Sequence, residues 1–233
     1  MVLVALLLIF FYLLYVVQPI FESAKVEKRD SFQVANSQQI AGLGVEEQTE
    51  VAYLLSQQGQ VDFYSVQDGS FGKKLKTLNA ELPSDATSFA TSAPFQGYYA
   101  FGLKDGTVMV VAPKFLVTFP NNERKLTPRL DFPLGEMALE VDEQGSAIKR
   151  FAFSHYEDRT AVVALTEDKR VLFSSFVAEE NMFTGEVEWV VERTELDVEG
   201  RVDELLMSPD TTRTFVRSAN QVYVYDTRDP SDV

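Results

Sequence analysis

The chain carries few side chains suited to catalysis, and its single histidine is the first of them. His155 stands in FAFSHYEDRT, where we expect a turn between two strands and a surface or capping role. The chain has no cysteine, and one histidine without thiolates cannot assemble the common zinc sites. A Ser-His-Asp triad would have to use His155, but no serine lies in the G-x-S-x-G motif of a hydrolase nucleophile. We therefore expect neither a metal site nor a catalytic triad.

Pairs of neighbouring carboxylates are a second possible source of chemistry. Such pairs perform acid–base work in glycosidases. In an acidic chain they usually mark solvated loops, so we expect turns at these positions and no enzymatic activity. The pairs are Glu46-Glu47, Glu179-Glu180 and Asp203-Glu204.

Two glycine-containing stretches invite comparison with a phosphate-binding loop: QDGSFGKK (67–74) and KDGT (104–107). A P-loop needs G-x-x-x-x-G-K-[ST] between a strand and a helix, and neither stretch meets this requirement. Asp-Gly instead supplies the positive φ values of tight hairpin turns. We expect Gly59 and Gly106 to occupy such turns. YDTRDPSD lacks the glycine and distal glutamate of a calcium loop, so we expect no cofactor.

The charge balance narrows the classes of partner. The formal net charge is −14, and it falls entirely on the part of the chain after residue 21. A strongly acidic domain repels phosphate backbones, so we expect no nucleic-acid binding. The same charge argues against the domain being a trap for phosphate or other anions. Without cysteine, disulfides are excluded.

The turns belong to an internal repeat of hairpins. Each hairpin is an apolar strand, a polar turn and a second strand rich in β-branched and aromatic residues. Valine recurs at the matching position of the second strand, at Val61, Val108, Val171 and Val222. The hairpins are VAYLLSQQGQVDFYSV (51–66), YYAFGLKDGTVMVVAP (98–113), AVVALTEDKRVLFSSF (161–176) and TFVRSANQVYVYDT (214–227).

Further strand-like stretches flank the hairpins. One precedes each hairpin, beginning near residues 38, 86, 148 and 202, and one follows each of the first three, near residues 73, 115 and 185. The unit is thus four strands in roughly 45 to 60 residues, which is typical of a β-propeller blade. We expect residues 38–233 to form an all-β, WD40-like β-propeller domain with about four blades. An antiparallel sandwich is the alternative.

The last unit, LLMSPDTTRTFVRSANQVYVYD, resembles the WD40 blade pattern most closely. Ser208, Pro209 and Asp210 form its first turn, because proline presets φ and aspartate can bond its own backbone. Asp226 ends the third strand, with Tyr225 where the pattern often has tryptophan. Propellers close their ring with strands that protect the edges, and no closing strand follows Asp226. We therefore expect further blades downstream in the natural protein.

The N-terminal stretch, LLLIFFYLLYVVQPIF (6–21), differs from the rest of the chain. No charged side chain precedes Glu22, and about 20 apolar residues suffice for a helix to cross a bilayer. We expect a transmembrane helix at 1–21 and a linker at 22–37. A cleaved export signal and a buried soluble segment are the alternatives, although a basic start and an A-x-A site are missing. The expected anchor residues are Leu6, Phe10, Phe11, Tyr12, Leu14, Tyr15, Val17 and Pro19.

Aromatic side chains crowd one segment of the β region. Phe95, Tyr98, Tyr99 and Phe101 stand close together, and Trp189 stands alone. In blades such residues mostly fill the space between sheets, whereas exposed aromatics mark a protein-docking patch. The sequence leaves both possibilities open.

The helix and the repeat together resemble the N-terminal part of the large permease subunits of Pst-type phosphate ABC transporters in gamma-proteobacteria. The resemblance rests on Phe11 through Pro19, which match a Phe-Tyr-Leu-x-Tyr-Val-Val-x-Pro-like helix end, with Phe21 close behind. In that family a long exported WD40-like region follows the first helix. The later permease helices of the family are absent from this sequence.

The resemblance implies a bacterial inner-membrane protein with a cytoplasmic N-terminus and a periplasmic β domain. Its implied partners are the lipid bilayer and, through the full-length protein, a second permease, an ATPase and a phosphate-binding protein. The β domain would then serve docking or regulation, while helices outside this sequence would move phosphate. A self-standing, membrane-anchored propeller scaffold for envelope assembly is the alternative function.

Overall fold

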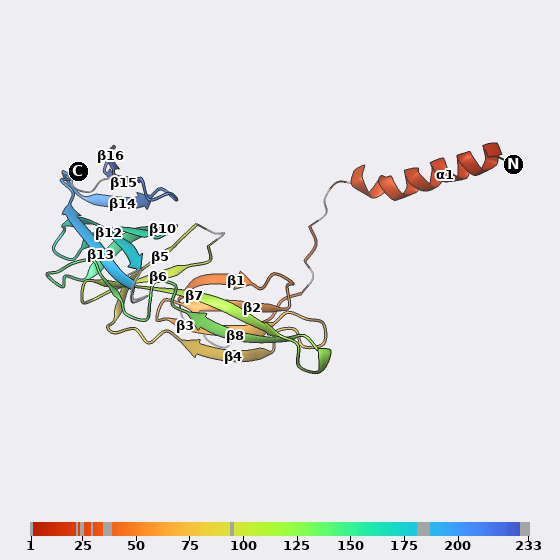
Figure 1. The fold of residues 1–233 in the computed structure, drawn as a ribbon, viewed down its shortest axis with the longest axis horizontal. Helices are drawn as coiled ribbons and strands as arrows, with labels where there is room; N and C mark the ends of the chain where they lie inside the picture. The colour runs from red at the N-terminus through yellow and green to blue at the C-terminus, as the bar shows by residue number, and fades with distance from the viewer. Residues whose placement is uncertain are drawn as a thin grey trace. The chain divides into compact units, whose positions relative to one another are not determined.

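A computed structural model gives the fold of the chain (Figure 1). The chain divides into two compact units, Met1–Gln33 and Val34–Val233. This division falls within the predicted linker at 22–37, and parts of that linker lie outside the described residues. The residues that the structure describes are 2–21, 23, 26–28, 30–34, 39–93, 96–180 and 187–228.

The first unit contains one α-helix, α1 (Val2–Val17), followed by the 3-10 helix η1 (Gln18–Phe21). The α-helix ends earlier than the predicted boundary at residue 21. Pro19 explains this end, because the residue before a proline is disfavoured in α conformation and proline has no N–H to donate. The side chains from Leu3 to Val16 are exposed. Among the described residues, no helix combines the length and apolar character needed to cross a membrane.

The second unit is all-β, as the sequence predicts. The alternation of apolar and polar residues along the chain explains why these segments form strands. All four predicted hairpins form, and each is preceded by the expected strand. The strands are β1 (Ile40–Val45), β2 (Val51–Ser56), β3 (Gln60–Ser65), β4 (Lys74–Asn79), β5 (Ala86–Thr91), β6 (Tyr99–Leu103), β7 (Thr107–Thr118), β8 (Lys125–Asp131), β9 (Leu139–Glu140), β10 (Ile148–Tyr156), β11 (Arg159–Thr166), β12 (Val171–Glu180), β13 (Val187–Glu195), β14 (Val202–Met207), β15 (Arg213–Ser218) and β16 (Gln221–Asp226).

The described strands form four antiparallel sheets, each in simple up-and-down order. The first sheet is β1-β2-β3-β4, and the second is β5-β6-β7-β8 with β9 also pairing with β7. The third is β10-β11-β12-β13 and the fourth is β14-β15-β16. The short connections between sequential antiparallel strands explain this order. Among these residues the sheets do not close into a ring.

Apolar clusters lie between successive sheets. The first unites the first and second sheets and includes Phe63 and Phe101, and the second unites the second and third sheets around Val108 and Phe153. The third unites the third and fourth sheets around Phe173. Each interface is lined from both sides because side chains alternate between the faces of a strand. The sheets are therefore stacked in series, each sharing a core with the next.

The strand β7, with 12 residues, is the longest strand of the second sheet and changes partners along its length. Its first part pairs with β6, whereas the part from Ala112 to Thr118 pairs with β8. The sequence predicts one further strand after residue 115, but the structure continues β7 and turns at η2 (Pro120–Asn122) into β8. Asn121 and Asn122 adopt positive φ values there, a conformation that asparagine tolerates. This part of the chain, residues 112–131, is called the long hairpin below.

The crowded aromatic residues lie mostly between sheets. Tyr99 and Phe101 are buried in the core shared by the first and second sheets, and the ring of Phe89 stacks on Tyr99. Trp189 is 37% exposed. Tyr98 is half-buried, and Phe95 lies outside the described residues. Tyr99 and Phe101 thus fill a core, as expected for blade aromatics, and Trp189 is the exposed member among those described.

Candidate functional site

The two predicted turn glycines lie in tight turns between paired strands. Gly59 joins β2 to β3 with φ of 83°, and Gly106 joins β6 to β7 with φ of 82°. The carbonyl oxygen of Gly106 accepts hydrogen bonds from the backbone N–H groups of Val141 and Asp142 at 3.1 and 3.0 Å. Both glycines therefore have structural roles, and Gly106 also connects its turn to the loop at residues 141–142.

The Ser208-Pro209-Asp210 segment forms the turn between β14 and β15. The Ser208 hydroxyl oxygen accepts the backbone N–H of Arg213 at 2.9 Å. An Asp210 carboxylate oxygen accepts the Thr212 hydroxyl and backbone N–H at 2.9 and 3.2 Å. Hydrogen bonds with Ser208 and Thr212 lower the pKa of Asp210. The side chains of the turn thus stabilise the turn itself, so its role is structural and local.

Asp226 is the last residue of β16 and forms an ion pair with Arg228. The hydrogen bonds from Arg228 lower the pKa of Asp226 to about 2. Both side chains are exposed, so the pair belongs to the surface.

His155 lies within β10, which corrects the prediction that it stands in a turn. It pairs with Thr160 of β11, and its Nδ1 atom is 2.9 Å from the Thr160 hydroxyl. Partial burial lowers the pKa of His155, with Asp158 opposing the shift. Antiparallel pairing extends nearly to the turn, which explains the difference from the prediction. These contacts give the histidine a role in cross-strand packing.

Two of the three acidic pairs lie in strands and not in the predicted turns, whereas Glu46-Glu47 lies in the turn between β1 and β2, where Glu47 is exposed. Glu179-Glu180 lies in β12 and Asp203-Glu204 in β14. Glu46 is only 7% exposed, and Arg124 of the long hairpin binds it at 2.5 Å while also pairing with Glu50. Strand pairing and ion pairs therefore position carboxylates that local sequence assigns to loops.

A second buried carboxylate lies between the second and third sheets. Asp142 is 3% exposed and binds Arg170 at 2.8 Å, and Arg170 also binds Asp168 at 2.7 Å. Burial raises the pKa of Asp142, but hydrogen bonds from Arg170 and from the backbone of Gln144 and Ser146 outweigh burial and lower it. No group of three or more potential metal ligands occurs among the described residues. The cluster is thus an ion-paired loop anchor.

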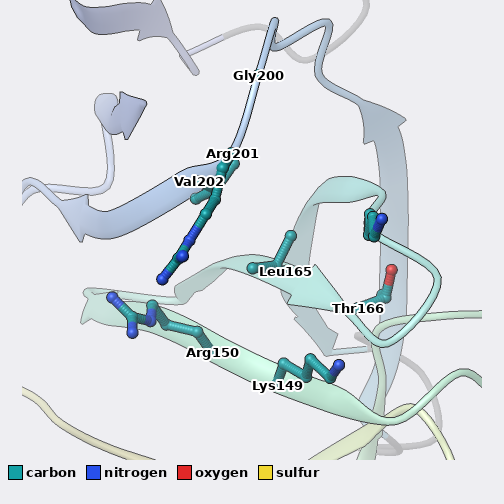
Figure 2. Close-up of a pocket in the computed structure, with 8 residues that line it drawn as sticks. Lys149, Arg150, Leu165, Thr166, Gly200, Arg201 and Val202 are labelled. Carbon is teal, nitrogen blue, oxygen red and sulfur yellow. The ribbon is translucent and has the colours of Figure 1, made fainter. Parts of the chain in front are cut away.

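A pocket lined by four basic residues and no acidic residue lies between β10, β11 and the entry to β14. It has a volume of about 620 Å³, and we call it the basic pocket. Figure 2 shows the Arg150 and Arg201 side chains extending into the same space, with their guanidinium ends toward one another. The residues that line the basic pocket are Lys149, Arg150, Leu165, Thr166, Lys169, Gly200, Arg201 and Val202.

Two of the four cations in the basic pocket have a carboxylate partner. Lys149 binds Glu167 at 2.7 Å, and Arg201 lies 3.5 Å from Asp203. Within the described part of the chain, Arg150 and Lys169 form no ion pair. The basic pocket therefore carries an excess of positive charge, although the chain as a whole is strongly acidic.

The basic pocket is a local exception to the acidic balance of the chain, on which the expectation against anion binding is based. Its cations come from three segments of the sequence, at 149–150, 169 and 201. A net charge contains no information about such clustering, and only the adjacent Lys149-Arg150 pair is visible in the sequence. Those two residues also line a neighbouring cavity of about 380 Å³ with Gln57, Thr87 and Ser88.

Comparison of the chain with known protein families and with curated proteins gives no match in either case. Function must therefore be argued from the chain itself.

Proposed function

We propose that the chain is the membrane anchor and extracytoplasmic β domain of a phosphate ABC transporter permease, in which the β domain serves docking or regulation. The observation that carries the proposal is the joining of a charge-free helix with exposed apolar side chains to a series of stacked antiparallel sheets. The resemblance of Phe11 through Pro19 to the permease helix supports the assignment to phosphate transport.

The anchor is supported by the chemistry of the first unit. Leu8 and Phe11 are 66% and 62% exposed, and exposed apolar area of this kind is unfavourable in water by about 25 cal/mol per Å². The 16 residues of α1 rise about 24 Å, and the four residues of η1 add about 8 Å at the 3-10 rise. Together they match the roughly 30 Å of a hydrocarbon core. We propose that α1 and η1 enter the bilayer as one segment.

A propeller-like arrangement is supported by strand order and by contacts between first strands. Each of the first three sheets contains a four-stranded meander, which is the organisation of a blade. The first strand of the third sheet, β10, contacts the first strands of both neighbouring sheets, β5 and β14. First strands gathered in this way are expected around a propeller axis.

The proposed docking surface is the outer face of the fourth sheet. Val61, Val108 and Val171 are buried in the cores that their sheets share with the next sheet. The matching Val222 is 59% exposed, as is Val224 at 58%. This face continues the serial stacking, so we propose that its occupant is another antiparallel sheet with an apolar face. Leu206 of β14 extends the same surface.

The test measures membrane retention on residues 1–233 alone, because the further helices of a full-length permease would retain it in the membrane, and measures phosphate uptake on the full-length protein in the source cells. The double variant Leu8→Arg/Phe11→Arg places two charges in α1, at about 2.5 to 3.5 kcal/mol each near the centre of a membrane helix. The matched control is Val26→Arg/Ser31→Arg, which adds the same charge at exposed positions after the helix. Carbonate-resistant membrane retention and phosphate uptake are measured for both.

We expect the helix variant to lose membrane retention and phosphate uptake while the control keeps both. Lost retention with unchanged uptake would overturn the transporter assignment and favour a self-standing scaffold for envelope assembly. Unchanged retention of the helix variant would overturn the anchor.

A further inference from the structure

We propose that the basic pocket binds a phosphate group, as a dianion held between Arg150 and Arg201. The inference does not rest on the proposed anchor or on phosphate transport, because it uses only the side chains of the second unit. The shared ligand chemistry is a tetrahedral oxyanion, supplied either as free phosphate or as a phosphate monoester.

The arrangement of the two arginines is the first argument. Their guanidinium ends extend into the same space from β10 and from the entry to β14 (Figure 2). Like charges that face one another repel, and an anion between them converts this repulsion into two attractions. A guanidinium group presents paired N–H donors that match the oxygen atoms of phosphate. The two arginines are therefore suited to bind one anion from opposite sides.

The charge balance is the second argument. Glu167 and Asp203 offset Lys149 and Arg201, but Arg150 and Lys169 have no ion-pair partner among the described residues. The lining of the basic pocket therefore carries an excess of positive charge, which favours a phosphate dianion over a carboxylate ligand with one negative charge and two oxygen atoms.

The backbone of the segments that carry Arg150 and Arg201 is fixed by neighbouring strands. Arg150 pairs with Leu165 across β10 and β11. Gly200 has φ of 85°, and a Cβ atom there would lie 3.0 Å from the Ser218 hydroxyl oxygen. That hydroxyl donates to the Glu199 carbonyl oxygen at 2.7 Å. The backbone before Arg201 is thus held beside β15, while the Arg201 side chain itself is 91% exposed.

The size of the basic pocket bears on the source of the phosphate group. Its volume of about 620 Å³ lies within the range of small-molecule sites. Leu165 and Val202 add apolar surface to the lining. A phosphate monoester would place its charged group between the arginines and its organic part against this surface.

The test is isothermal titration calorimetry on the full chain in non-ionic detergent micelles at pH 8 and constant ionic strength. The ligands are inorganic phosphate, glycerol 3-phosphate and acetate. The variants Arg150→Gln and Arg201→Gln each remove one guanidinium group at an exposed position. The matched control is Arg129→Gln, which removes an exposed guanidinium on β8 outside the basic pocket.

We expect at least one of the two phosphate ligands to bind, and acetate to bind more weakly. Each pocket variant should weaken binding about tenfold or more, the effect of losing a charge-assisted hydrogen bond, while Arg129→Gln leaves it unchanged. Tighter binding of inorganic phosphate identifies a free anion, and tighter binding of glycerol 3-phosphate identifies a monoester. Absence of binding, equal binding by all variants or a preference for acetate would overturn the proposal.

Discussion

Gly106 shows how much a single residue contributes to this fold. It combines a positive φ with a close approach to a neighbouring loop, because a Cβ atom there would lie 3.0 Å from the Asp142 carbonyl oxygen and from the Gly145 Cα. Gly69 has nearly the same φ, 81°, but nothing lies within 4 Å of its Cβ position. An alanine at either position would have a strained backbone, but only an alanine at Gly106 would also overlap with neighbouring atoms.

We predict that Gly106→Ala destabilises the protein more than Gly69→Ala does. The left-handed conformation costs about 1–2 kcal/mol for alanine in both variants. Overlap with backbone atoms that cannot move freely should add about 1–3 kcal/mol at Gly106 alone. Urea unfolding followed by circular dichroism measures the difference. Equal destabilisation of the two variants would show that the contact with residues 142–145 relaxes without cost.

At the scale of elements, the long hairpin is the least regular part of the fold and joins the first two sheets. Phe115 packs edge-on against Phe63 with ring centroids 5.7 Å apart, and it also lies against Tyr53. The Lys76 ammonium donates to the Pro128 carbonyl oxygen at 3.1 Å. Arg124 pairs with Glu46 and Glu50 at the hairpin end. Aromatic packing and ion pairs thus fasten the hairpin to the first sheet.

We predict that Phe115→Ala destabilises the protein by about 2–3 kcal/mol, below the 3–5 kcal/mol typical of a fully buried phenylalanine because the side chain is half-buried. Phe119→Ala is the control within the same hairpin. Its side chain is 65% exposed, so its loss should change stability by less than about 0.5 kcal/mol. Chemical unfolding of both variants measures the contrast. Similar effects of the two changes would mean that the hairpin does not pack on the first sheet in solution.

For the whole molecule, charge is unevenly distributed. The chain has a formal net charge of −14, yet four cations line the basic pocket. Several carboxylates depend on specific donors; the pKa values of Asp62 and Asp142 are lowered by hydrogen bonds that outweigh burial. A lowered folded-state pKa stabilises the protein above the unfolded-state pKa, and this stabilisation is lost as pH falls through the folded value. The protein should therefore lose stability below about pH 4.

We predict that Asp142→Asn destabilises the protein by about 2–3 kcal/mol at neutral pH, because it removes the buried carboxylate of the pair and leaves half-buried Arg170 with Asp168 alone. The difference from the unaltered protein should shrink as pH falls below about 4, the unfolded-state pKa, towards the lowered pKa of folded Asp142. Glu136→Gln is the control for removing one charge, since Glu136 is exposed. Thermal unfolding from pH 3 to 7 measures the effect. A difference independent of pH would contradict the assigned ionic role of Asp142.

The sequence by itself determined the all-β character and the positions of the paired strands. The alternation around Val61, Val108 and Val171 is a local pattern, and two-residue periodicity directly sets which side chains face a core. The end of α1 at Val17 could have been predicted too, because Pro19 acts on the residue beside it.

Only the tertiary structure decided the path of the long hairpin, the pairing of β9, the strand position of His155 and the make-up of the basic pocket. Arg150, Lys169 and Arg201 come from separate segments, and nothing in their local sequence states that they meet. Likewise, Val222 has the same sequence pattern as its three counterparts, but its exposure depends on whether another sheet lies beside it. Local periodicity specifies strands, whereas sites and interfaces depend on long-range packing, because they join residues whose proximity is set by the stacking of whole sheets.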